Sequence, residues 1–248
     1  SGMIQLPIAL QAYSLRRIFE ENPLQALRAV RNAGYDGVEF YGTHFLPDLY
    51  AALLKETGLV CAGWHTGIDA LEQNFDETLR RNLAVGNRYI CVPYFKADSV
   101  DGWKAFADRL NAVAEKLARY GLKTGYHSHA HDHQDVEGRI PWEIVAENTS
   151  PQVILQLDTG NAMCGGADVF SALSRYPGRN QSIHLKPYSK SAGYEPAIGE
   201  DDLPWEKILS WCETEGRTEW LVVEYEMEKE PVDAVERSLA FLRKLRPR

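Results

Sequence analysis

The sequence predicts a (β/α)8 barrel, an α/β fold in which eight parallel strands, each followed by a helix, close around one core. Three observations predict it. Short apolar runs alternate with amphipathic stretches from one end of the chain to the other. The length of 248 residues suits one such barrel. Residues with metal-ligating side chains end the last four apolar runs, and strand ends converge at one mouth in a barrel.

Eight apolar runs have the length and composition of buried parallel strands. We place these strands at residues 8–14, 37–41, 60–65, 89–94, 123–128, 153–158, 182–186 and 220–225. In the seventh run, period-two alternation puts Ser182, His184 and Lys186 on one face. The opposite face is apolar, so we expect the polar face to point into the barrel.

Between the strands, apolar residues recur at three- and four-residue spacing, the pattern of a helix with one buried face. The clearest helical patterns cover residues 23–33, 75–85, 103–120, 205–215 and 232–245. Glycines that suit a left-handed C-terminal cap follow at Gly34, Gly58, Gly86, Gly121 and Gly216. An open Rossmann-like sheet is the alternative fold, but no Gly-x-Gly-x-x-Gly follows the first strand.

We expect one domain over residues 3–248, because no Pro-, Gly- or Ser-rich linker interrupts the alternation. Ser1 and Gly2 are interpreted as the remnant of a cleaved tag. The longest irregular stretch, residues 188–204, follows the seventh strand. It is a candidate lid over the barrel mouth, and a plain surface insertion is the alternative.

Composition narrows the possible partners. The chain has 27 basic and 35 acidic residues and a net charge of −8, which works against binding to nucleic acid or anionic membrane. Neither a membrane-spanning run nor a secretory signal is evident, so we expect a cytoplasmic protein. The sequence leaves open whether the chain forms a homo-oligomer. The cysteines lack Cys-x-x-Cys spacing and are interpreted as reduced packing residues: Cys61, Cys91, Cys164 and Cys212.

The strongest chemical signal is a set of four residues at successive strand ends, namely His127, Asp158, His184 and Glu224. Taken singly, Asp158 could be a helix N-cap and His184 a core histidine. Four such coincidences at neighbouring strand ends are less probable than one shared metal site. Two imidazoles with two carboxylates suit Mn, Co, Zn or Fe, and Mg is a poorer match.

Further polar residues lie at or near the strand ends. His129 shares a face with His127, whereas His131 and His133 are interpreted as part of a solvated histidine-rich loop. Glu39 and His65 end earlier strands, where we favour substrate contact over hydrogen bonding inside the barrel. Two further candidate substrate contacts are Lys186 and Asn161.

Several short segments resemble one known family. They are Gln-Ala-Tyr-Ser-Leu-Arg (11–16), Ala-Gly-Tyr-Asp-Gly-Val-Glu (33–39), Gly-Tyr-His-Ser-His (125–129), Leu-Asp-Thr-Gly-Asn (157–161), His-Leu-Lys (184–186), Ile-Gly-Glu-Asp (198–201) and Val-Glu-Tyr (223–225). Their order and spacing are similar to the sugar phosphate isomerase/epimerase family of xylose isomerase-like TIM barrels. The resemblance spans nearly the whole chain.

The resemblance implies a single divalent ion held by His127, Asp158, His184 and Glu224, and a small carbohydrate as substrate. It further implies that a carboxylate removes the proton next to the substrate carbonyl and that an enediolate follows. We assign Glu224 as the principal base, with His127 or His129 completing proton transfer. No Gly-rich phosphate cradle is evident, so an unphosphorylated substrate is slightly favoured over a sugar phosphate. Lys186, Lys190 or Arg139 could meet the phosphate of such a substrate.

Two departures from the family pattern keep other functions open. His127-Ser128-His129 stands where epimerases of the family commonly carry Glu-Asn-His, and Asn161 stands where His is frequent. The lost glutamate makes a dehydratase or lyase acting on an inosose or 3-keto-glycoside the main alternative to an isomerase/epimerase. An endonuclease IV-like nuclease and a non-catalytic sugar-binding barrel are weaker alternatives.

Overall fold

The computed structural model describes residues 5–248. The interpretation of Ser1 and Gly2 as a tag remnant therefore lies outside the described residues. Eight strands run parallel to one another. They are β1 (Ile8–Gln11), β2 (Gly37–Tyr41), β3 (Val60–His65), β4 (Tyr89–Val92), β5 (Lys123–His127), β6 (Ile154–Gln156), β7 (Ser182–Leu185) and β8 (Trp220–Val223).

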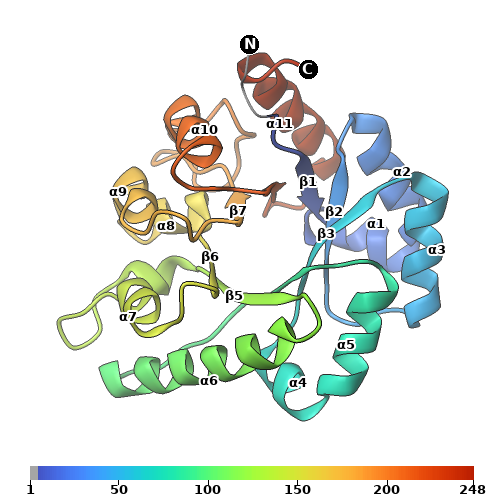
Figure 1. Cartoon of the computed structure of the whole chain (residues 1–248). Coiled ribbons are helices and arrows are strands. Elements are labelled where there is room, and N and C mark those ends of the chain that lie inside the picture. The colour runs from blue at the N-terminus through green and yellow to red at the C-terminus, as the bar shows by residue number, and fades with distance from the viewer. Residues whose placement is uncertain (1–4) are drawn as a thin grey trace.

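Helices surround the strands (Figure 1). They are α1 (Arg16–Glu21), α2 (Pro23–Ala33), α3 (Pro47–Thr57), α4 (Ile68–Gln73), α5 (Phe75–Ala84), α6 (Val100–Ala118), α7 (Pro141–Asn148), α8 (Thr159–Cys164), α9 (Val169–Ser174), α10 (Trp205–Glu213) and α11 (Pro231–Leu245). Two short 3-10 helices follow strand ends, η1 (Ala12–Leu15) and η2 (Ala130–His133).

The strands close into a barrel, as predicted. β1 pairs with both β2 and β8, which excludes an open sheet that begins at β1. One group of strands has the order β3-β2-β1-β8-β7 and the other has the order β4-β5-β6. Backbone hydrogen bonds join the groups at both seams, from Thr66 N to Cys91 O at 3.0 Å and from His184 N to Leu157 O at 2.9 Å.

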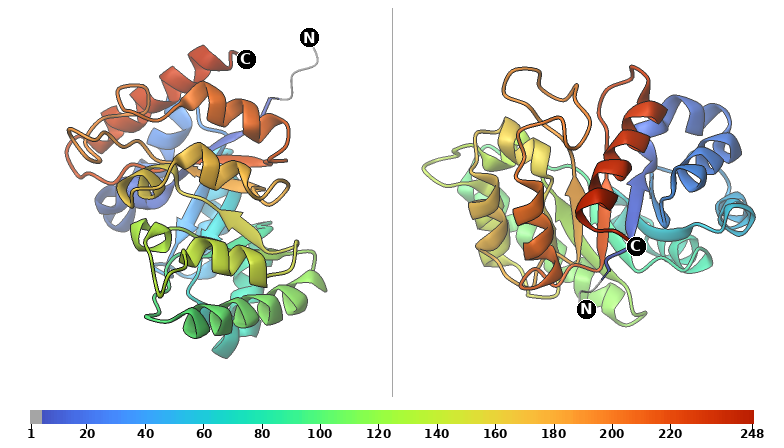
Figure 2. Two further views of the ribbon diagram at one scale, coloured as in Figure 1. Left: turned by 90° about the vertical axis from the view of Figure 1, so that its left-hand side faces the viewer. Right: turned by 90° about the horizontal axis from the view of Figure 1, so that it is seen from above.

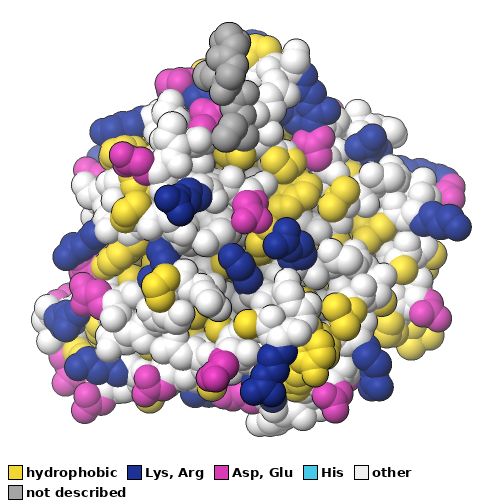
Figure 3. Space-filling model, in the orientation of Figure 1, with side chains coloured by type: hydrophobic (Ala, Val, Ile, Leu, Met, Phe, Trp, Pro, Cys, Tyr) yellow, Lys and Arg dark blue, Asp and Glu magenta, His cyan; other side chains and the backbone are white. Residues whose placement is uncertain are grey.

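The two ends of the barrel differ. Figure 2 shows the carboxyl terminus at the end where the strands begin and the long loop between β7 and α10, in orange, at the opposite end. The surface in Figure 3 mixes basic, acidic and apolar side chains and displays no histidine. Within residues 5–248, no helix combines the length and the apolar character that crossing a membrane requires.

The barrel interior is filled in layers that change from apolar to polar. Trp220 at the start of β8 packs against a cluster of Ala9, Ala62 and Val222. The next layer toward the strand ends is polar, and Gln11 and Glu39 there are 0% and 1% exposed. Because side chains alternate along a strand, the same interior faces lead directly to the strand ends.

Local sequence signals explain why the helices begin and end where they do. At α2, the Asn22 side chain accepts a hydrogen bond from Gln25 N at 3.1 Å, and Pro23 occupies the first turn. Gly34 ends the helix with φ of 108°. The caps predicted at Gly58, Gly86 and Gly121 also have positive φ. The cap predicted at Gly216 is wrong, because Arg217 takes the positive φ of that turn.

Several boundaries differ from the prediction. The first strand ends at Gln11, since residues 12–15 turn into η1, and β6 ends at Gln156 before the N-cap Asp158.

All four cysteines are free, as expected, but Cys164 is exposed at the end of α8 and is not a packing residue.

Hydrogen bonds hold the long loop between β7 and α10 against helices α8 and α11. The Tyr194 hydroxyl donates to Asn161 Oδ1 at 2.8 Å, and Ile198 N donates to the Ser238 hydroxyl at 3.0 Å. Ala197 and Ile198 are 0% and 1% exposed, so the loop contributes to the packed core. Its assignment as a lid stays a prediction.

We predict that Gly125→Ala destabilises the barrel. A β-carbon at this position of β5 would lie 2.2 Å from Ile154 O, a backbone atom of the neighbouring strand that cannot move aside. The expected loss in the free energy of unfolding is about 1–3 kcal/mol, measured by chemical denaturation.

The matched control is Gly67→Ala. Nothing lies within 4 Å of a β-carbon there, and the φ of Gly67 is −61°. This control should be neutral or slightly stabilising. Equal stabilities for the two variants would contradict the packing argument.

Candidate metal and substrate site

Four side chains converge at the carboxyl ends of β5 to β8. His127, Asp158, His184 and Glu224 each offer one potential ligand atom, and these atoms all lie within 4.8 Å of one another. All four residues are buried. The structure therefore brings together the four residues that the sequence analysis placed in one site. We call them the four-residue cluster.

The two carboxylate oxygens of Asp158 differ in their hydrogen bonding, and one of them favours a nearby cation. Its Oδ1 caps α8 by accepting a hydrogen bond from Asn161 N at 2.8 Å. Its Oδ2 is buried and has no hydrogen-bond donor among the described residues. A buried carboxylate oxygen without a donor is costly unless a cation offsets it, and the Lys186 ammonium lies 3.0 Å from this oxygen. The N-cap interpretation of Asp158 therefore holds for Oδ1, and Oδ2 is available as a ligand atom.

Lys186 lies beside the four-residue cluster. Its ammonium is 3.0 Å from Asp158 Oδ2 and 2.9 Å from Glu224 Oε1, and it also pairs with Glu226. The contact with Asp158 is an ion pair without hydrogen-bond alignment. Although burial opposes its charge, these carboxylates hold the pKa of Lys186 well above its usual value. The positive charge of Lys186 therefore compensates the negative charge of these carboxylates.

His184 is oriented by Glu39 of β2. His184 Nε2 lies 2.6 Å from Glu39 Oε1, while Nδ1 lies 3.3 Å from Glu224 Oε1. With the Nε2–H donated to Glu39, Nδ1 faces the four-residue cluster. A carboxylate behind a histidine in this way fixes its tautomer and ring orientation in metal sites.

A buried hydrogen-bond network extends this arrangement to His127. Gln156 Nε2 donates to Glu39 Oε2 at 2.9 Å and to the Ser182 hydroxyl at 2.7 Å. Gln156 Oε1 lies 3.1 Å from His127 Nδ1 and 2.8 Å from His65 Nε2. His127 can thus donate from Nδ1 and present Nε2, which is 3.6 Å from Asp158 Oδ2.

Sequence reasoning missed Gln11 and Gln156. Gln11 Nε2 donates to Glu39 Oε1 at 2.7 Å, so four protein side chains contact the Glu39 carboxylate. Burial opposes ionisation of Glu39, but His65 and His184 outweigh it and lower its pKa to about 2. The available signal for Gln156 was parity, since it lies two residues before Asp158 and period-two alternation predicts the same face for both.

A cavity of about 410 Å³ opens beside the four-residue cluster. It is lined by Gln11, Tyr13, Tyr41, Gly42, His65, Pro93, His127, His129, Glu224 and Glu226. Of the residues predicted to contact substrate, His65 lines it. Glu39, Lys186 and Asn161 are not among its lining residues, and Asn161 Nδ2 donates to Ser128 O at 3.0 Å.

The pKa values of one carboxyl group and two imidazoles on the cavity wall are all lowered. Burial opposes the charge of Glu224, but Lys186 and His184 hold its pKa well below the usual value. Burial, followed by the charge of Lys186, lowers the pKa of His129 to about 4. Burial also lowers the pKa of His127 well below its usual value. The wall therefore combines an ionised carboxylate with neutral imidazoles.

Comparisons with known proteins agree with the fold. The model of a family described as xylose isomerase-like TIM barrel matches residues 27–245. An inosose dehydratase of Geobacillus kaustophilus is 35% identical over 85 residues, which are 34% of this chain and 27% of that protein. An inosose dehydratase of Lactiplantibacillus plantarum is 23% identical over an alignment covering 93% of this chain and 90% of that protein.

Among solved structures, a sugar phosphate isomerase/epimerase of Parabacteroides distasonis superimposes with a TM-score of 0.86. The sequences are 21% identical, and the match covers 100% of this chain and 96% of the other. At this level of identity, the likeness demonstrates a shared fold.

We predict that Glu39→Gln weakens binding of a divalent ion by about 10- to 100-fold, because an amide no longer orients His184 as a carboxylate does. Asp158→Ala should abolish measurable binding. Calorimetric titration of metal-stripped protein with Mn²⁺ tests both variants. Glu115→Gln, on the exposed face of α6, is the control and should bind as the wild type does. Unchanged affinity in Asp158→Ala would place the ion elsewhere.

Proposed function

The chain belongs to the xylose isomerase-like TIM-barrel family, and on that premise we propose that it is a divalent-metal-dependent enzyme acting on a small sugar or keto-sugar. Its first step would be removal of the proton next to the substrate carbonyl. The observation that carries the proposal is the position of Glu224. This residue belongs to the four-residue cluster and also lines the adjoining cavity.

The donor set fits a resident metal ion. His127, Asp158, His184 and Glu224 would hold it, and two imidazoles with two carboxylates match Mn, Co, Zn or Fe better than Mg. When bound, such an ion would polarise the substrate carbonyl and stabilise the negative charge left by proton removal.

Glu224 is suited to act as the base. Its Oε1 faces His184 and Lys186, which leaves Oε2 for a substrate proton. Lys186 and His184 hold the pKa of this carboxyl low against burial, so the group is ionised before it meets a substrate proton. His65 lines the same cavity and is engaged with Gln156 through Nε2, so its Nδ1 can form a hydrogen bond with a substrate oxygen.

Isomerisation or epimerisation is the leading outcome. It requires the proton to return at another position or on the other face of the substrate. His127 and His129 come from β5 and the segment after it, across the mouth from Glu224 and Glu226, which follow β8. We assign completion of proton transfer to this pair, and to His129 when His127 serves as a ligand.

Elimination is the second candidate, and a specific observation favours it. The β5 side of the cavity contributes His127 and His129 and no carboxylate. In an elimination, Glu224 would take the proton from carbon as the carbon–carbon double bond forms. It would then pass this proton to the departing oxygen, so one carboxylate suffices. The relatives with detectable sequence identity include inosose dehydratases.

The other two alternatives have less support. A nuclease of the endonuclease IV type needs several metal ions and a basic DNA-binding face. Within the described residues, the two potential ligand groups share His127 and His184 and so form one site, and the net charge is −8. A barrel that only binds sugar would retain the cavity without turnover.

We predict that Glu224→Gln lowers exchange of the substrate α-proton with deuterated solvent by about 10²- to 10⁴-fold, the usual contribution of a positioned base. The measurement is proton NMR of keto-sugars incubated with Mn²⁺-loaded protein in D₂O. Glu115→Gln is again the control, since this glutamate is exposed on α6. Undiminished exchange in a variant that still holds the metal would exclude Glu224 as the base.

The two outcomes are distinguished by product analysis. Wild-type protein is incubated with 2-keto-myo-inositol, a 3-keto-glucoside and a ketohexose, and carbon NMR follows each reaction. An epimer or isomer with no released group supports the leading outcome. Release of water or of the glycosyl substituent supports elimination.

A further inference from the structure

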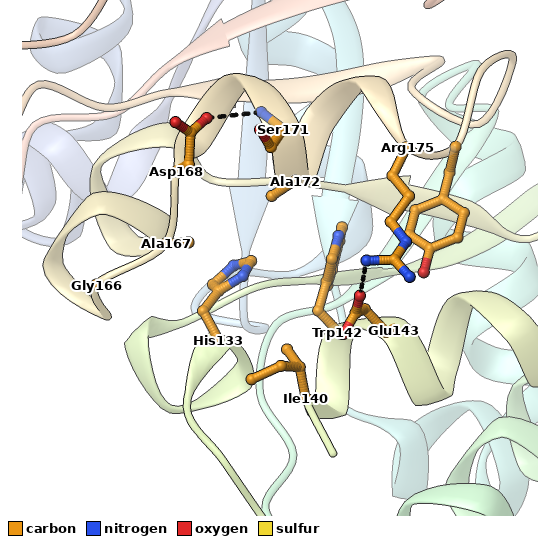
Figure 4. Close-up of a pocket in the computed structure, with 11 residues that line it drawn as sticks. His133, Ile140, Trp142, Glu143, Gly166, Ala167, Asp168, Ser171, Ala172 and Arg175 are labelled. Carbon is orange, nitrogen blue, oxygen red and sulfur yellow. Dashed lines mark hydrogen bonds and ion pairs between the residues drawn. The ribbon is translucent and has the colours of Figure 1, made fainter. Parts of the chain in front are cut away.

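A second cavity, of about 290 Å³, lies on the outer side of the barrel wall between α7 and α9. It is lined by His133, Ile140, Trp142, Glu143, Gly166, Ala167, Asp168, Ser171, Ala172, Arg175 and Tyr176. Figure 4 shows His133 and Trp142 projecting from the η2 and α7 side toward α9, where Ser171 and Ala172 lie. None of these residues lines the cavity beside the four-residue cluster.

The walls of this outer cavity combine ring-shaped and small apolar groups. The rings of His133 and Trp142 are in contact, with centroids 5.6 Å apart. Ile140 contributes an aliphatic side chain, and Ala167 and Ala172 contribute methyl groups. Such walls suit a compact ligand with at least one apolar face.

Two buried polar atoms in these walls lack partners. His133 is 6% exposed, which corrects its assignment to a solvated loop. Neither its Nε2 nor the Tyr176 hydroxyl has a hydrogen-bond partner among the described residues. A buried polar atom without a partner costs free energy, so each is a point at which a ligand can gain a hydrogen bond.

The charged groups around the outer cavity are already paired or capping. Arg175 forms an ion pair with Glu143, and Asp168 Oδ1 accepts a hydrogen bond from Ser171 N at 2.9 Å. Burial lowers the pKa of His133 to about 4, so its imidazole is neutral near pH 7. Among the lining residues, no cation is left for a phosphate or a carboxylate.

We propose that the outer cavity binds an uncharged sugar or cyclitol ring. Such a ring has carbon–hydrogen faces that pack on Trp142 and Ala172. Its hydroxyl groups, spread around the edge, can pair with both His133 Nε2 and the Tyr176 hydroxyl. A simple phenol has a single hydroxyl group to offer these two atoms, and an anion would meet Asp168 and Glu143. This binding does not depend on the reaction proposed for the barrel mouth.

The test is ligand-observed saturation-transfer NMR of metal-free protein titrated with D-glucose, myo-inositol and phenol. We expect D-glucose or myo-inositol to saturate at about millimolar concentration, the range expected for a ligand of this size. Ala172→Phe fills the cavity and should weaken that binding at least about 10-fold. Tyr176→Phe removes only the unpartnered hydroxyl and should weaken it by about 3- to 10-fold.

One control locates the effect: Ala112→Phe adds the same ring on the exposed face of α6 and should bind as the wild type does. If Ala172→Phe does not fold, Tyr176→Phe decides the question. Absence of saturable sugar binding would overturn the proposal. So would binding that survives both outer-cavity variants, or preference for phenol over both sugars. Loss of binding in Glu224→Gln would assign the sugar to the barrel mouth and also overturn it.

Discussion

The compensation of buried charges inside the barrel is the constraint on which the site depends. Glu39, Asp158 and Glu224 are carboxylates with at most 5% exposure, and burial of an unpaired charge is expensive. Lys186 lies between Asp158 and Glu224, and four side chains contact Glu39. The closed barrel supplies these partners from strands that are distant in sequence, so the charges are tolerable only when the barrel is complete.

The same buried contacts also orient the histidines of the four-residue cluster. The Glu39 and Gln156 layer orients His184 and His127 from below, and these histidines then present their other nitrogens to the strand ends. A site held by such a supporting layer needs little rearrangement to take a ligand. Lys186 and a divalent ion would compete for the same carboxylates, so the affinity proposed for the ion would depend on how readily Lys186 releases Asp158 and Glu224.

The segments that leave β5 and β6 serve both cavities. The tract before and within η2 carries His129 at the barrel mouth and His133 in the outer cavity. Helix α8 begins at the cap Asp158 and leads to Gly166 and Ala167 of the outer cavity. These two segments also pack on one another, since a β-carbon on Gly165 would lie 2.4 Å from Ala130 O. The inner site and the outer cavity therefore share their supporting structure.

The sequence by itself determined the barrel and the members of the four-residue cluster. Period-two alternation in strands, three- and four-residue spacing in helices and polar strand ends are local patterns. Parallel strands bring their carboxyl ends together in any closed barrel. Only the tertiary structure decided what each polar side chain touches. Glu39 orients His184, Lys186 neutralises carboxylates, and His133 is buried against Trp142. These outcomes depend on contacts between elements far apart in the chain, for which spacing along the sequence carries no signal.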